Sequence, residues 1–173
     1  MPANTHGPCP LAAAALITWK RNGEYGARLV ADLTPGQWLA QPVAGRVMNH
    51  PAWVFAHLIL YAHIAVRLAS AEPFDDPAEH RYGQKSEPLS EANAYQTPER
   101  MLATWRAVHA EGAAALAAAT PALTSAPNPL ARWRTLHPTV GDMLITLMVK
   151  HESGHLGQLS AWRRGMGMGP VAV

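Results

Sequence analysis

Apolar residues recur every three to four positions in four long segments of the chain, which is the period of an amphipathic helix. The first predicted helix covers residues 11–33 and ends at Thr34-Pro35-Gly36. The second begins at Asn49-His50-Pro51 and continues to about residue 71, and the third covers 97–119 from Thr97-Pro98. In both, a capping side chain precedes a proline that suits the first turn.

The fourth predicted helix covers residues 139–164, with Thr139 and Asp142 spaced as a capping box and Gly165 as the stop. No segment alternates with period two, so we expect no sheet. The pattern predicts an all-α four-helix bundle in one domain, 1–173, with a flexible arm at 1–10 and a tail at 165–173. The connection 72–96 is long for a bundle, and such loops are usually functional or disordered.

Composition narrows the class of protein. A chain of 173 residues is long enough to bury about 70% of its unfolded surface, so neither disulfides nor a structural metal is required for folding. Cys9 is the single cysteine and lies in the predicted arm, which favours a reducing cytoplasm. Fourteen basic against twelve acidic residues give a net charge of +2, and the basic residues are spread thinly, which argues against nucleic-acid binding.

Membrane association is not expected either. The longest charge-free apolar stretch, residues 53–66, contains two histidines and is shorter than the roughly 18 residues of a membrane span. Residues 11–19 are apolar, but no Lys or Arg precedes them as a secretory signal requires. We therefore expect a soluble cytoplasmic protein.

The most specific motif is His151-Glu152-Ser153-Gly154-His155, which has the H-E-x-x-H pattern of zinc metalloproteases. Those proteases complete their site with a ligand further along the chain. Residues 156–173 contain no His, Asp or Glu, and no strand-bearing region precedes the motif. A third ligand must come from upstream, so the sequence argues against a protease.

His151 and His155 lie on the apolar stripe of the fourth helix, and His57 lies on that of the second. One such histidine is most simply a hydrogen-bonded core residue. Three unpaired imidazoles in an apolar core would each cost a few kcal/mol, whereas three that converge form a common transition-metal site. His57 is therefore the best candidate for the third ligand.

The other titratable candidates have weaker positions. Glu152 is one residue round from His151, so it points to the rim of the site, as an acid–base group, or to a neighbouring helix, as a structural carboxylate. His63 lies about 120° from the face of His57, and His50 shares that face two turns away. Three other histidines lie in predicted loops: His6, His80 and His137. His109 lies on the third predicted helix, which contains no second histidine.

Three motifs together resemble the DinB-like (YfiT-like) superfamily: N-H-P-A-W-V-F-A-H-L at 49–58, T-P-E-R-M-L-A-T-W-R at 97–106 and H-E-S-G-H-L-G-Q-L-S-A-W-R-R at 151–164. The resemblance covers nearly the whole chain in the expected order. It implies an up-down-down-up four-helix bundle, often a homodimer, with a divalent metal held by His57, His151 and His155. Characterised relatives include mycothiol-dependent maleylpyruvate isomerase and bacillithiol transferases. The family name refers to DNA damage, but it implies no nucleic-acid work.

Three functions stay open at this point. The first is a metal-dependent enzyme that uses a low-molecular-weight thiol, as an S-transferase or isomerase of a small-molecule substrate; metal coordination converts a thiol to thiolate. The second is a metal-dependent hydrolase assisted by Glu152, and the third a non-catalytic metal-binding stress protein. Zinc or nickel suits imidazole best, with iron or manganese as alternatives. We expect Trp53 and Tyr61 to line the pocket, and Arg67 or Arg163 to hold a carboxylate of the substrate. The six tryptophans favour a homodimer, since one small core is not expected to bury all of them.

Overall fold

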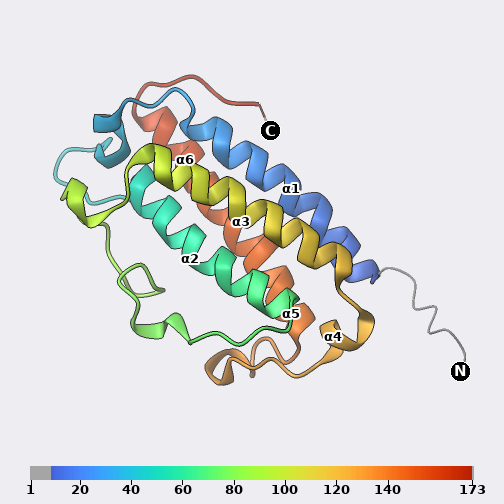
Figure 1. The fold of residues 1–173 in the computed structure, drawn as a ribbon. Helices are drawn as coiled ribbons and strands as arrows, with labels where there is room; N and C mark the ends of the chain where they lie inside the picture. Colours follow the sequence, from blue (N-terminus) through green and yellow to red (C-terminus); the bar gives the residue numbers. More distant parts are fainter. Residues whose placement is uncertain (1–8, 173) are drawn as a thin grey trace, which may run out of the picture.

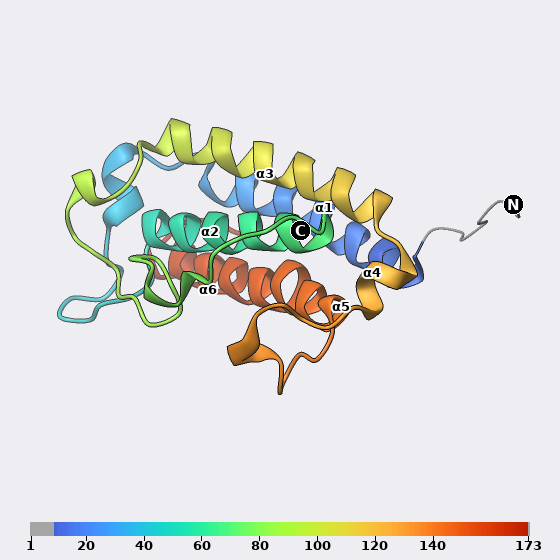
Figure 2. The same cartoon turned by 60° about the horizontal axis from the view of Figure 1, so that its bottom comes forward.

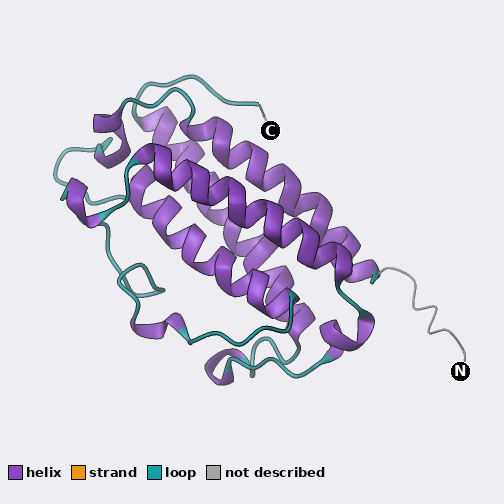
Figure 3. Cartoon of the chain, viewed as in Figure 1, coloured by secondary structure: helices purple, strands orange, loops and turns teal. Residues whose placement is uncertain are grey.

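Four long helical segments make up about half of the protein, whose computed structural model describes residues 9–172. They are α1 (Pro10–Val30), α2 (Pro51–Ala69), α3 (Pro98–Ala118) and a fourth composed of α5 (Val140–Leu144), a π-helical stretch (Ile145–His151) and α6 (Glu152–Gly165). Among the described residues there is no strand (Figure 3). The predicted all-α class is confirmed. The short elements are α4 (Pro121–Ser125) and the 3₁₀ turns Pro35–Leu39, Pro77–Glu79, Ala92–Ala94 and Ala131–Trp133.

The helices begin where local chemistry predicts. The Thr97 side chain accepts a hydrogen bond from Arg100 N, and His50 Nδ1 accepts one from Trp53 N. Thr139 and Asp142 form the predicted capping box, with Asp142 Oδ2 2.9 Å from Thr139 N. The first helix ends at Val30, earlier than the predicted residue 33, because the chain turns there toward the Thr34–Gln37 cap.

The bundle has an up-down-down-up topology, which can be followed by colour in Figure 1. α2 and α3 run in the same direction, so the segment between them has to return along the bundle. A helix of 19 residues such as α2 is about 28 Å long, which explains the length of the connection. The loop predicted at 72–96 is therefore a crossover, which we call the crossover segment (residues 70–97).

α3 packs against both α1 and α2, and the fourth helical segment packs against the same two helices from the other side (Figure 2). Five of the six tryptophans are 5% exposed or less and fill this core: Trp19, Trp38, Trp53, Trp105 and Trp162. The tryptophan count therefore gives no reason to expect a second copy, and the homodimer rests on the resemblance alone.

The structure also bears on the predicted N-terminal arm and on the apolar character of α2. Residues 1–8 of the predicted arm lie outside the described residues, whereas Cys9 is buried beside Thr124 and Pro10 starts α1. α2 is long and apolar enough to span a membrane by length and composition alone. However, 67% of its most apolar window is buried inside the bundle, which is the burial of a core helix.

Candidate metal centre

Three histidines from two helical segments converge beside the core. His57 comes from α2, His151 closes the π-helical stretch, and His155 lies one turn later in α6. Their potential ligand atoms all lie within 4.8 Å of one another, and Nε2 of His57 lies 2.9 Å from Nε2 of His151. The structure thus brings together the three residues that the sequence selected.

The π-helical stretch contributes to this convergence. Four-residue steps in an α-helix drift by about 40° around the axis, so positions 143, 147, 151 and 155 would spread over about 120°. A π-helical turn is wider and reduces that drift. All four side chains line one cavity: Met143, Leu147, His151 and His155. The sequence predicted a plain α-helix here, since the wider turn leaves no mark in the apolar pattern.

Hydrogen bonds to Nδ1 fix the tautomers of two of the histidines. A carbonyl oxygen only accepts, so His57 Nδ1 must donate to the Tyr82 carbonyl at 2.7 Å. Likewise His155 Nδ1 donates to Gln158 Oε1 at 3.0 Å, and Asn49 Nδ2 donates to the same oxygen. In both rings Nε2 is left with its lone pair, which is the arrangement found in metal-ligating histidines.

This donor set fits a divalent metal ion. Two imidazole nitrogens on one divalent ion each lie about 2.1 Å from it, and hence about 3.0 Å from each other at a 90° angle and about 3.4 Å in a tetrahedron. The 2.9 Å between Nε2 of His57 and Nε2 of His151 is close to the short end of that range. His151 Nδ1 is buried and has no hydrogen-bond partner among residues 9–172, so no hydrogen bond fixes the tautomer of this ring. We assign Nε2 as the ligand atom of His151 because Nε2 lies beside Nε2 of His57.

Burial keeps the imidazoles uncharged. Desolvation, followed by the mutual repulsion of the rings, lowers the pKa of His57 to about 4 and that of His151 to about 3. Burial also lowers the pKa of His155, against the hydrogen bond to Gln158. At neutral pH all three rings are in the form that binds metals.

The histidines open onto a cavity of about 550 Å³, which is in the size range of small-molecule sites. Trp53 forms one wall and stacks on His57, with ring centroids 4.6 Å apart. Tyr61 forms another, with its ring 4.8 Å from His57 and 4.9 Å from His151. Both residues line the cavity, and their contact with a substrate stays a prediction.

The crossover segment holds the α2 side of the site. The Tyr82 carbonyl accepts from His57, Ser86 Oγ accepts from Trp53 Nε1 at 3.2 Å, and the Leu89 carbonyl lies 3.0 Å from His50 Nε2. These contacts follow one face of α2 at positions 50, 53 and 57. Sequence reasoning marked this loop only by its length, because backbone carbonyls carry no sequence signal. His50 is a helix cap, whereas His63 is exposed.

Glu152 does not reach the cavity. It is 2% exposed and points toward α3, where its Oε2 lies 3.3 Å from His109 Nε2. Burial raises the pKa of Glu152, and the contacts with His109 and Asn22 oppose that rise. Trp19 and Trp105 enclose the His109 ring, with centroids 4.0 and 4.1 Å away. This is the neighbouring-helix placement that the sequence left open, and it makes Glu152 and His109 a buried structural pair.

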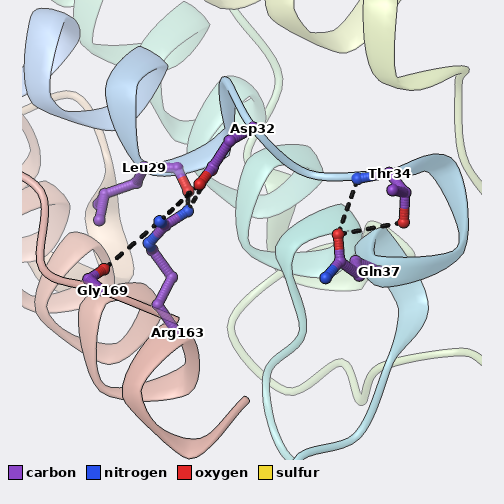
Figure 4. Close-up of polar contacts among 6 residues, drawn as sticks. All are labelled: Leu29, Asp32, Thr34, Gln37, Arg163 and Gly169. Atoms are coloured by element: carbon purple, nitrogen blue, oxygen red, sulfur yellow. Dashed lines mark hydrogen bonds and ion pairs between the residues drawn. The ribbon is translucent and has the colours of Figure 1, made fainter. Parts of the chain in front are cut away.

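The two arginines expected to hold a substrate carboxylate, Arg67 and Arg163, form ion pairs outside the cavity. Arg67 is half exposed, pairs with Glu72 at 3.0 Å and borders a different cavity at the far end of α2. Arg163 is buried and bonds Asp32 together with the carbonyls of Leu29 and Gly169 (Figure 4). That contact ties α6 to the end of α1 and to the C-terminal residues. Neither guanidinium faces the histidines.

The chain is similar to a known protein family along most of its length. The sequence profile of the DinB superfamily matches residues 19–159, which is most of the chain. The chain belongs to the DinB superfamily. No curated protein and no solved structure gave a significant match. The resemblance seen in the three sequence motifs is thus confirmed. Three of the four histidines in those motifs converge in this member of the DinB superfamily: His57, His151 and His155.

Proposed function

We propose that this DinB superfamily protein is a metal-dependent enzyme that acts on a small molecule with a low-molecular-weight thiol, as an S-transferase or isomerase. One divalent ion is held by His57, His151 and His155. The observation that carries the proposal is that the three histidines converge at the wall of an accessible cavity. The Nδ1 hydrogen bonds of His57 and His155 leave Nε2 of each ring with a lone pair that can bind the ion.

An open coordination position distinguishes catalytic from structural metal sites. Structural zinc sites are closed by four protein ligands. Within residues 9–172 the cluster offers three ligands and no fourth, and its free side faces the cavity. This supports a role for the ion in binding a small molecule.

In this proposal the residues around the ion have separate roles in ligand orientation and in substrate binding. A bound divalent ion supplies Lewis acidity, which is strong enough to deprotonate a coordinated thiol outright. The Tyr82 carbonyl and Gln158 hold the His57 and His155 rings in orientation. Trp53 and Tyr61 present flat, apolar walls that exclude water and orient the acceptor.

Two features favour a thiol over water as the nucleophile. The first is membership of a superfamily whose characterised enzymes include thiol-dependent ones. The second is that no Asp or Glu lines the cavity among the described residues, and Glu152 is directed toward α3. A hydrolase in the manner of H-E-x-x-H enzymes would need that carboxylate beside the metal-bound water.

The test uses cobalt-substituted protein. Addition of a low-molecular-weight thiol should produce a sulfur-to-cobalt charge-transfer band, absent from metal-free protein and from His151→Ala. His63→Ala, which changes an exposed histidine of α2, should behave as wild type. Cleavage of esters or amides without any thiol band would establish the hydrolase instead. A metal-loaded protein inert toward both would be a non-catalytic binding protein. Zinc and nickel are the first metals to compare, then iron and manganese.

A further inference from the structure

A fourth histidine reaches the cavity from an unexpected direction. His137 lies in the segment 126–139 between α4 and α5, which the sequence analysis treated as an ordinary loop. Its side chain is half-buried and lines the same cavity as His57, His151 and His155. No ring contact between His137 and any of the three ligands is among the described aromatic pairs, so His137 lines the cavity outside the ligand cluster.

The loop is built to hold this residue in place. Asn128 is fully buried, and its Nδ2 donates to the His137 carbonyl at 2.9 Å. The His137 N–H donates to the Trp133 carbonyl at 2.8 Å, and Asn128 N donates to the Pro138 carbonyl at 2.9 Å. A buried amide that satisfies backbone groups in this way is costly to replace. His137 therefore has a defined position despite its place in a loop.

The imidazole is oriented as well. His137 Nδ1 lies 3.1 Å from the hydroxyl of Thr146, which belongs to the π-helical stretch and also lines the cavity. Thr146 is the hydrogen-bond partner of this ring within residues 9–172. Nε2, on the other side of the ring, is left to exchange a proton with a bound molecule.

Other side chains in the cavity are poor proton carriers. Besides the three ligands, Tyr61 and His137 are the titratable residues among those that line it. Burial raises the pKa of Tyr61, with the nearby Arg132 guanidinium opposing the rise, so its hydroxyl holds its proton at neutral pH.

We infer that His137 is the proton-transfer residue of this cavity, an inference that rests on the proposed thiol chemistry. The S–H bond of the incoming thiol breaks, its proton goes to Nε2 of His137, and its electron pair stays on sulfur. Sulfur then forms a bond to the electrophilic carbon of the acceptor. The electron pair of the breaking bond leaves with the departing group, which takes the proton back from His137, so no oxidant or reductant is needed.

The matched variants are His137→Gln, which keeps a polar side chain, and His63→Gln as the control on α2. His137→Gln should retain one metal ion per chain and the thiol band of the cobalt protein. Turnover should fall on the order of 10²-fold, the usual contribution of a positioned acid–base group. Exogenous imidazole should restore part of the rate in His137→Ala. Unchanged turnover in His137→Gln would overturn the inference, and so would loss of the metal.

A second readout does not depend on turnover. In zinc-loaded protein with ¹⁵N-labelled histidine, the Nε2 signal of His137 should move toward the protonated value when a thiol is added. A normal thiol band with an unchanged Nε2 signal would overturn the role of His137 and leave the proposed function intact. Absence of the band with every thiol would overturn the proposed function and this inference with it.

Discussion

Acidification should lower the free energy of unfolding of the metal-free protein, because the histidine cluster is buried in its neutral form. The pKa of His57 is about 4 in the folded protein, whereas an unfolded histidine has a pKa of about 6.5. Between these values the unfolded chain binds more protons than the folded one. The contribution of His57 is therefore fully present above about pH 6.5 and is lost as the pH falls toward 4.

The size of the loss follows from the two pKa values. For His57 alone it amounts to about 1.4 kcal/mol at pH 5.5 and about 3 kcal/mol at pH 4. The ring is 3% exposed, so solvent screening does not reduce these values much. His151, with its pKa of about 3, adds to the loss in the same direction.

Urea unfolding of metal-free protein at pH 7 and pH 5.5 measures this effect. The comparison is between wild type and His57→Gln, in which the titrating group is absent, with His63→Gln as an exposed control on the same helix. Between pH 7 and pH 5.5 the free energy of unfolding should drop by about 1.2 kcal/mol less in His57→Gln than in the other two proteins. Equal losses in all three would refute a buried, neutral His57.

Three other predictions test separate parts of the structure. Glu152→Ala should keep one metal ion per chain but lower stability by about 2 kcal/mol, because it removes the 3.3 Å contact with His109 and leaves a space in the core; thermal unfolding and elemental analysis distinguish this from a loss of metal. Removal of the metal should leave far-UV helicity largely intact, since the bundle buries its own core; collapse of the helical signal would make the site structural. Sedimentation at micromolar concentration should show a homodimer, and a monomer would count against that expectation.

The sequence was sufficient for features set by local or periodic patterns. Apolar spacing placed His57, His151 and His155 on inward faces, and the missing ligand after His155 directed attention upstream to α2. The helix starts at Pro51, Pro98 and Val140 followed from side chains within one turn. These inferences needed no knowledge of which segments are neighbours.

The rest of the site depends on contacts between distant segments. The Tyr82 carbonyl meets His57 only because the crossover segment returns along α2. His137 reaches the cavity through a loop held by Asn128, and neither residue belongs to a recognisable motif. The sequence left Glu152 open between an acid–base group and a structural carboxylate, because it points about 100° away from the adjacent His151 on the helix. That rotation carries it to His109 on α3.

The metal content of the untagged protein tests the central claim most directly. Purified protein, loaded with zinc or nickel and dialysed, should contain one divalent ion per chain by elemental analysis. His57→Ala, His151→Ala and His155→Ala should each lose most of it, because every variant removes one of three ligands. His63→Ala should keep it, since that side chain is exposed on the outer face of α2. Near-full occupancy in His57→Ala, or no bound ion in loaded wild type, would contradict a three-histidine metal centre.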